Sequence, residues 1–240
     1  MESSDIEDSS KSEILTLSEI AYYLKVSEKT ILRMVKRGEL PGSKIASQWR
    51  FQRVAIEQWL TAKMDSAPAD RLVDVIQTTS TIIPLAKLIT PNRIIMDLEA
   101  GDRTFVLQQL IQPLADGNLL DNPDQFLRSL NEREEMGSTG IGYGVAIPHV
   151  REQENSGVRQ TCVVMGICKE GVDFDALDGE PTYVFMLLCG NSVTIHLRLL
   201  AKTMLMLRTP GMLDSLRRCK DCEDVETLLR KSDFNLSIQF

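Results

Sequence analysis

The stretch from Arg133 to Arg151, REEMGSTGIGYGVAIPHVR, is the most informative part of this sequence. Glycines packed this closely let the backbone take positive φ and approach a ligand, so that amides can point toward an anion. The run ends in Pro148 and His149, one of only two histidines in 240 residues. An imidazole can act as a nucleophile near neutral pH, and the guanidinium of Arg133 suits phosphate oxygens. These residues indicate a phosphoryl group carried on His149, although a histidine beside glycines is often only a hydrogen-bonded turn residue.

The segment GSTGIGYGVAIPH resembles the active-site segment of phosphotransferase-system EIIA domains of the mannitol/fructose and nitrogen-related type. The resemblance covers roughly residues 85–232. It implies that His149 accepts phosphate from the phosphocarrier HPr or its nitrogen-branch relative, with Arg133 as the arginine of the motif. It also implies a protein that carries phosphate on a histidine nitrogen, with no cofactor other than the covalent phosphoryl group.

The second histidine, His196, stands in the segment NSVTIHLRLLAKT. From the residues alone, a capping or core histidine and a functional one are equal alternatives. The EIIA resemblance implies that His196 neighbours His149 and stabilises the bound phosphoryl group by its charge distribution. The loop is expected to add phosphate contacts, although its hydroxyl residues also suit a plain turn; these loop residues are Gly137, Ser138, Thr139 and Gly140.

Around this loop the sequence predicts an α/β sandwich over residues 85–240, with a mixed sheet flanked by helices. Two apolar runs, 161–168 and 183–189, are typical of strands buried on both faces. Helices are predicted over 103–115, where Pro113 is expected to kink or end the helix, and over 124–135. The tail FNLSIQF, 234–240, alternates apolar and polar residues and is expected to add an edge strand or a dimer contact.

Charge is distributed unevenly along the chain. The whole sequence carries −7, yet residues 11–64 hold ten basic residues against five acidic ones. A basic segment on an acidic chain indicates a separate domain that faces nucleic acid. The sequence has no apolar run long enough to span a bilayer and no signal peptide, so a cytoplasmic protein is expected. The five cysteines are expected to be reduced, and Cys219 and Cys222 have no second ligand pair, so no metal is expected.

Residues 13–62 predict a small, mostly helical winged helix-turn-helix domain. Thr16 and Glu19 form a capping box for a first helix, and Ser27 caps a second over 28–37, with Ile31, Leu32 and Val35 inward. A hairpin near 45–51 and a helix over 54–60 follow. This segment resembles the excisionase/MerR-type family, which implies a DNA contact set of Lys29, Thr30, Arg33, Lys36, Arg37, Lys44, Gln48 and Arg50. The alternatives are a solvated charged face or a domain that binds protein instead.

The remaining residues are predicted to be a disordered tail, 1–12, and a linker, 63–84, with a short apolar patch at 72–76. Together the domains suggest a cytoplasmic transcription regulator whose EIIA-type domain is phosphorylated on His149. The alternatives are a carrier that passes phosphate to the cysteine of a separate EIIB protein for sugar uptake, and a docking module that is not phosphorylated. A dimer would fit paired half-sites on DNA.

Overall fold

The computed structural model describes residues 14–24, 26–66, 84–151, 153 and 155–238. The chain divides into two compact units, residues 1–66 and 67–240. The predicted tail, 1–12, and most of the predicted linker, with its patch at 72–76, lie outside the described residues. No helix within the described ranges combines the length and the apolar character that crossing a membrane requires.

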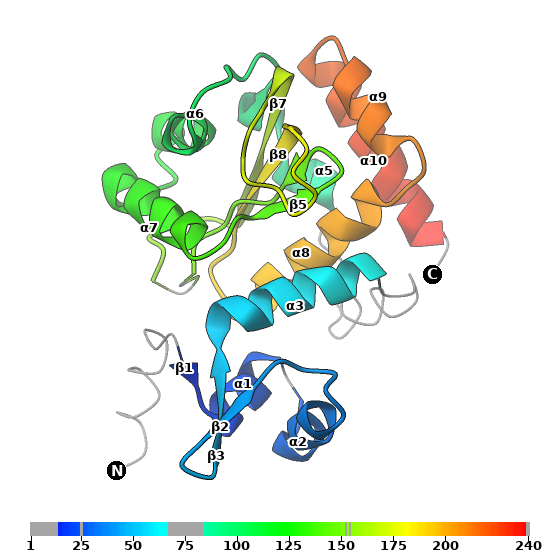
Figure 1. The fold of residues 1–240 in the computed structure, drawn as a ribbon. Helices are drawn as coiled ribbons and strands as arrows, with labels where there is room; N and C mark the ends of the chain where they lie inside the picture. Colours follow the sequence, from blue (N-terminus) through cyan, green and yellow to red (C-terminus); the bar gives the residue numbers. More distant parts are fainter. Residues whose placement is uncertain (1–13, 25, 67–83, 152, 154, 239–240) are drawn as a thin grey trace. The chain divides into compact units, whose positions relative to one another are not determined.

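The N-terminal unit contains two short helices, a three-stranded sheet and a third helix (Figure 1). Thr16 accepts a hydrogen bond from Glu19 N while Glu19 accepts one from Thr16 N, which forms the predicted capping box of α1 (Leu17–Tyr23). Ser27 caps α2 (Glu28–Lys36). The sheet has the order β1-β3-β2, and α3 (Arg53–Ser66) follows it directly, extending beyond the predicted helix end at 60; the strands are β1 (Ile14–Leu15), β2 (Ser43–Ile45) and β3 (Gln48–Gln52).

The wing is a tight hairpin between β2 and β3. Its two turn residues, Ala46 and Ser47, have φ of 47° and 67°, as a two-residue turn of the I′ type requires. Phe51 in β3 is 1% exposed and lies opposite Leu15 of β1 in the sheet, and Ile20 of α1 and Ile56 of α3 are also fully buried. Trp59 is half-buried and donates Nε1–H to Glu39 O at 2.5 Å. These contacts confirm the predicted helix-turn-helix with a wing.

The C-terminal unit is built on a five-stranded sheet with the order β4-β7-β8-β6-β5. The two long central strands, β7 and β8, form an antiparallel pair. On one side β4 runs parallel to β7, and on the other side β6 runs parallel to β8. This is the predicted mixed sheet; its strands are β4 (Ile94–Ile95), β5 (Gly140–Gly142), β6 (Val145–Ala146), β7 (Cys162–Val172) and β8 (Thr182–Cys189). Every residue of β8 except Tyr183 is buried, as its apolar sequence predicts.

Helices cover both faces of this sheet (Figure 1). On one face, α6 (Arg103–Asp116) and α7 (Pro123–Glu135) pack over a core that includes Val106, Leu110 and Phe126. The other face is covered by α8 (Val193–Leu207), α9 (Met212–Arg218) and α10 (Cys222–Ile238). A short helix, α5 (Leu85–Leu88), and a 3-10 turn, Pro91–Arg93, lead into β4.

Two sequence expectations are contradicted in part in this unit: α6 does not end at Pro113, and the tail does not add an edge strand. A kink at Pro113 and a dimer contact of the tail stay predictions. Helix α6 continues through Pro113 to Asp116, because the buried side chains on both sides of the proline, Ile111 and Leu114, keep the same face against the core. The tail over 234–238 extends α10 and does not form an edge strand. The reason is the helical spacing of Val225 and Leu229, which are 0% and 1% exposed and hold α10 on the unit.

Candidate functional site

His149 lies just beyond β6, where the chain continues beside the end of β8. Pro148 O accepts a hydrogen bond from Leu188 N at 2.9 Å, and His149 forms a parallel bridge with Leu188. The imidazole is only 5% exposed, and its Nδ1–H donates to Ile147 O at 2.9 Å. A carbonyl can only accept, so the proton of the neutral ring lies on Nδ1 and the lone pair on Nε2. In the part of the chain that is described, Nε2 has no hydrogen-bond partner.

The structure brings His196 against His149. Ser192 Oγ accepts from Ile195 N and caps α8, so His196 lies in the first turn of that helix. The centroids of the two imidazole rings are 4.7 Å apart, with the ring planes at 43°. His196 is 4% exposed, and its Nδ1 has no partner among the described residues. The two histidines of the chain therefore form one buried pair.

Arg133 supplies the positive charge of this site. It lies in the last turn of α7, is 3% exposed, and donates from Nη1 to Gly137 O at 2.7 Å. Burial and, after it, the charge of Arg133 and the neighbouring His196 hold the pKa of His149 well below its usual value. Burial and Arg133 lower the pKa of His196 to about 4. Both rings are therefore neutral near pH 7, which leaves His149 Nε2 nucleophilic in surroundings that favour an anion.

The polar groups of the predicted phosphate loop form hydrogen bonds to other groups of the protein. Glu134, which is 2% exposed, accepts the amide of Thr139 at 2.9 Å and also its hydroxyl. Burial raises the pKa of Glu134, and the bonds from Thr139 oppose that shift. Gly140 N donates to Ser138 Oγ at 2.9 Å, while Gly137 contributes its carbonyl to Arg133. Phosphate binding by these four residues stays a prediction, and it requires that these hydrogen bonds exchange.

The glycines of the loop allow its backbone to take conformations and close contacts that a side chain would prevent. The β5–β6 turn takes positive φ at Gly142, Tyr143 and Gly144, with values of 91°, 55° and 78°. At Gly140 a Cβ would come within 2.9 Å of Ala176 Cα, so only glycine fits there without a shift of backbone. This packing places Thr139 O where it accepts from Ile147 N at 3.0 Å, and so connects the loop to the strand that carries His149.

Gln153 is a site residue that the sequence did not single out. It is 3% exposed, donates from Nε2 to Val150 O at 2.5 Å, and has no partner for Oε1 among the described residues. A Cβ added to Gly190 would lie 3.5 Å from this Oε1 and 3.4 Å from His196 N, which places Gln153 beside the start of α8. Only the fold reveals this neighbour, because the loop after His149 contains no motif that would identify it.

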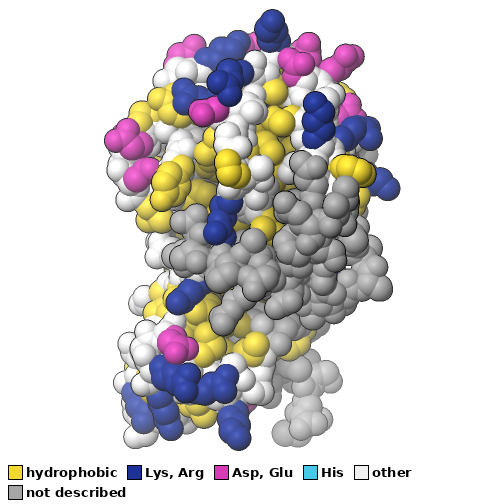
Figure 2. Space-filling model, turned by 90° about the vertical axis from the view of Figure 1, so that its right-hand side faces the viewer, with side chains coloured by type: hydrophobic (Ala, Val, Ile, Leu, Met, Phe, Trp, Pro, Cys, Tyr) yellow, Lys and Arg dark blue, Asp and Glu magenta, His cyan; other side chains and the backbone are white. Residues whose placement is uncertain are grey.

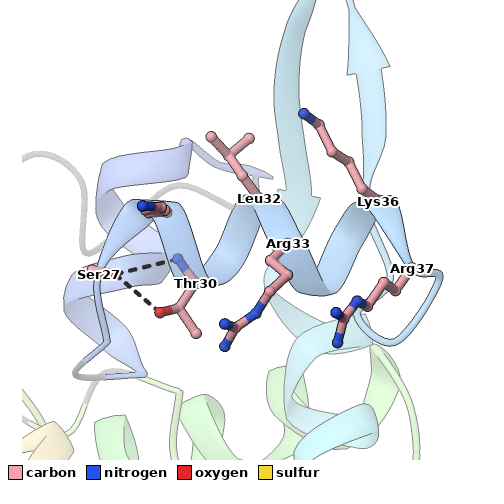
Figure 3. Close-up of a pocket in the computed structure, with 7 residues that line it drawn as sticks. Ser27, Thr30, Leu32, Arg33, Lys36 and Arg37 are labelled. Carbon is pink, nitrogen blue, oxygen red and sulfur yellow. Dashed lines mark hydrogen bonds between the residues drawn. The ribbon is translucent and has the colours of Figure 1, made fainter.

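A second candidate site lies on α2 of the N-terminal unit. Figure 2 shows Lys and Arg side chains gathered on this unit. The predicted contact residues of α2 line one shallow hollow, which Figure 3 shows in close-up; the lining is Ser27, Lys29, Thr30, Leu32, Arg33, Lys36 and Arg37. Thr30 is half-buried and hydrogen-bonded to Ser27, while the four basic side chains are exposed. The face is therefore positively charged and open to a polyanion.

The predicted wing residues lie on the hairpin and outside that hollow. Lys44 Nζ lies 5.5 Å from the centroid of the Trp49 ring. Arg50 donates to Gln48 Oε1 at 2.7 Å and to Trp49 O at 3.0 Å. These bonds hold Gln48 and Arg50 against the hairpin. With Lys44 and Arg50, the wing is a second basic element, and it follows α2 along the chain.

Leu32 does not have the position that the sequence predicted for it. Ile31 and Val35 are buried as expected, but Leu32 is only half-buried and lines the basic hollow. In Figure 3 it projects from the same side of α2 as Lys36. Its spacing of three and four residues from Lys29 and Lys36 was the available signal, because such residues share one helix face. Leu32 adds an apolar contact to an otherwise charged surface.

Comparisons with known proteins match both units of the chain. A family model described as "Phosphoenolpyruvate-dependent sugar phosphotransferase system, EIIA 2" matches residues 87–232, and a helix-turn-helix domain model matches residues 14–64. A nitrogen regulatory protein of Pseudomonas aeruginosa is 34% identical over 144 residues, which is 59% of this chain and 92% of that protein. The fructose-specific EIIABC component of Bacillus subtilis is 31% identical over 104 residues, 43% of this chain but 16% of that protein.

Among solved structures, the nitrogen regulatory protein IIA-Ntr of Neisseria meningitidis is similar to the C-terminal unit. The TM-score is 0.54 at 28% identity, covering 60% of this chain and 97% of that one. The matched part corresponds in extent to the unit that holds His149, His196 and Arg133. The N-terminal unit is matched by the helix-turn-helix model.

Proposed function

Because this chain belongs to the phosphotransferase-system EIIA 2 family, we propose that His149 accepts a phosphoryl group and that its state controls a DNA-binding unit. The observation that supports this proposal most directly is the buried histidine pair beside Arg133, with the lone pair of His149 on Nε2. A cytoplasmic phosphocarrier of the HPr type is the proposed donor. The N-terminal helix-turn-helix unit is the proposed reader of DNA.

The proposed transfer is a displacement at phosphorus. Nε2 of His149 attacks the phosphoryl group of the donor phosphohistidine, the donor's nitrogen–phosphorus bond breaks, and a new nitrogen–phosphorus bond forms on Nε2. The Nδ1–H bond to Ile147 O fixes the tautomer and the orientation of the ring before attack, while burial and the charge of Arg133 keep the ring neutral. Arg133 and an N–H of His196 would then face the phosphoryl oxygens, where positioned positive charge contributes most in phosphoryl transfer. Because Nε2 is itself covered, docking of the donor must displace a neighbouring group.

Phosphorylation would reverse the electrostatics of the site. In the unphosphorylated form, a buried guanidinium faces two neutral rings. A phosphoryl group adds between one and a half and two negative charges at neutral pH, so it would pair with Arg133. A change of this kind can alter which surface the unit presents to a partner, and so alter DNA occupancy.

The test is intact-mass analysis after incubation with phosphoenolpyruvate, Enzyme I and HPr. We expect one acid-labile phosphoryl adduct on the wild-type chain and none on His149→Ala. His196→Ala serves as the matched comparison, since it removes the other buried imidazole and should retain the adduct at a lower rate. An adduct that persists on His149→Ala would refute the assignment of the acceptor.

Transfer of the phosphate to a cysteine of a separate EIIB protein is the second candidate function. It is favoured by the similarity to a fructose-specific component whose name includes EIIB and EIIC parts. Incubating the phosphorylated chain with such an EIIB protein would show loss of the adduct from His149. The third alternative, a docking module without phosphorylation, is the outcome if no donor gives an adduct.

A further inference from the structure

Two buried cysteines face each other beside the phosphoacceptor site. Cys162 is the first residue of β7 and Cys189 the last of β8, and the antiparallel register places them directly opposite. Both are 0% exposed, and both are free thiols. Opposed residues of antiparallel strands have Cα atoms about 4.5 to 5.5 Å apart, which is inside the range that a disulfide spans.

The buried guanidinium of Arg93 lies close enough to this pair to stabilise a negative charge on a thiolate. Arg93 precedes β4, which runs parallel to β7, and it is 9% exposed. Its Nη1 donates to Leu88 O at 3.0 Å, while Nε has no partner within the described ranges. No described carboxylate forms an ion pair with it. A guanidinium stays charged when buried, so a neighbouring anion such as a thiolate would be stabilised.

The environments of the two thiols differ. The hydrogen bond from Cys189 and the charge of Arg93 lower the pKa of Cys162, against the opposing effect of burial. The pKa of Cys189 is raised well above its usual value by its bond to Cys162 and by burial. Cys162 is thus the better nucleophile, and Cys189 keeps its proton until a partner sulfur becomes electrophilic. This difference assigns the attack on an oxidant to Cys162 and the resolving step to Cys189.

We propose that Cys162 and Cys189 are a redox-active dithiol that hydrogen peroxide closes to a cross-strand disulfide, and that the closed form accepts phosphate poorly at His149. In the first step the Cys162 thiolate attacks a peroxide oxygen, the O–O bond breaks, and a sulfenic acid and hydroxide form. Cys189 then gives up its proton and attacks the Cys162 sulfur, which releases water. Two sulfurs lose two electrons in total, and the peroxide is reduced to two waters that carry both thiol protons.

The strand end that carries Cys189 also carries the groups of the acceptor site. The preceding residue, Leu188, bonds to Pro148 O and pairs with His149. The next residue, Gly190, packs against His196 N, and the chain then enters α8. Although the Cα spacing suits a disulfide, the fixed Cβ–S–S–Cβ dihedral of the bond would re-orient this strand end and shift His149 relative to His196. This coupling rests on the proposed function of His149, whereas the disulfide itself does not.

The first measurement needs no phosphate donor. The full-length protein is treated with stoichiometric hydrogen peroxide, blocked with a thiol reagent and digested, and the peptides are mapped by mass. We expect a Cys162–Cys189 linkage with the loss of two hydrogen atoms, reversed by dithiothreitol. The triple variant Cys168→Ala, Cys219→Ala, Cys222→Ala keeps the pair and should behave identically. No linkage in either protein would overturn the proposed dithiol.

The second measurement compares phosphoryl acceptance before and after peroxide. We expect the rate to fall at least tenfold in the triple variant, since misplacing a reacting group by about 1 Å can cost about 100-fold. Cys189→Ala should keep its rate after the same treatment, which separates the effect from methionine oxidation. A mapped disulfide with an unchanged rate would overturn the coupling. A reduced protein that never accepts phosphate would instead refute the proposed function and leave the mapping result valid.

Discussion

Acid should destabilise the C-terminal unit, and His196 should account for a defined part of that loss. In the folded chain the pKa of His196 is lowered to about 4, while in the unfolded chain it should return to its usual 6.5. The unfolded state therefore binds more protons between these values, so stability is complete above 6.5 and is lost as the pH falls toward 4. At pH 4.5 the loss attributable to His196 is about 2.5 kcal/mol, at 1.36 kcal/mol for each tenfold change in proton binding.

The assay is urea unfolding at pH 7 and pH 4.5, comparing wild type with His196→Asn. The chain offers an internal control, because its only two tryptophans, Trp49 and Trp59, lie in the N-terminal unit and its only two histidines in the other. Far-UV circular dichroism follows both units, and tryptophan fluorescence follows the N-terminal one. His149 and Glu134 also titrate, but they are present in both proteins, so their contributions largely cancel in the comparison.

We expect the C-terminal transition of wild type to lose about 2.5 kcal/mol more than that of His196→Asn between the two pH values. The tryptophan transition should not distinguish the two proteins. Equal losses of unfolding free energy in both proteins would refute the conclusion that the His196 imidazole is buried and neutral. An NMR titration of His196 with a midpoint near its usual value would contradict it independently.

Two further predictions concern other parts of the chain. Arg33→Ala should weaken DNA binding and reduce the slope of log affinity against log salt by about one. The control variant Arg128→Ala, on α7, should leave that slope unchanged. Equal slopes for the two variants would exclude a phosphate contact by Arg33. Asp233 accepts from buried Lys202 at 2.8 Å and from the amides of Leu85 and Ala86 at 3.2 and 2.8 Å. Asp233→Asn should therefore lower the unfolding free energy by about 3 kcal/mol. The control variant Glu226→Gln, which removes an ion pair with the exposed Arg230, should lower it by less than about 0.5 kcal/mol. Similar urea midpoints for the two variants would contradict the stabilising role of Asp233.

Much of the architecture was available from short-range signals in the sequence. Caps at Thr16 and Ser27 lie where predicted, because each needs only a hydroxyl and an amide three residues later. The two apolar runs became the central strands, since only a sheet covered on both faces buries every side chain. The errors at Pro113 and in the C-terminal tail arose where a local rule competed with packing against the core.

The site itself divides in the same way. The glycine motif, His149 and Arg133 were identified from their order in the chain, and they lie within the residues that the EIIA family model matches. The sequence could not show that Glu134 holds Thr139 or that Gln153 lies beside the start of α8. Each of these contacts depends on how distant segments pack or on which side of a helix the core lies.

The sequence by itself determined two domains of opposite charge, a helix-turn-helix with its caps, and a histidine after a glycine-rich turn. Those features are carried by spacing, propensity and charge, which act over a few residues. Only the tertiary structure decided that both histidines are buried and neutral, and that the lone pair of His149 lies on Nε2. The physical reason is that protonation depends on desolvation and on the charge of Arg133, which acts on the two rings only once α7, β6 and α8 have come together.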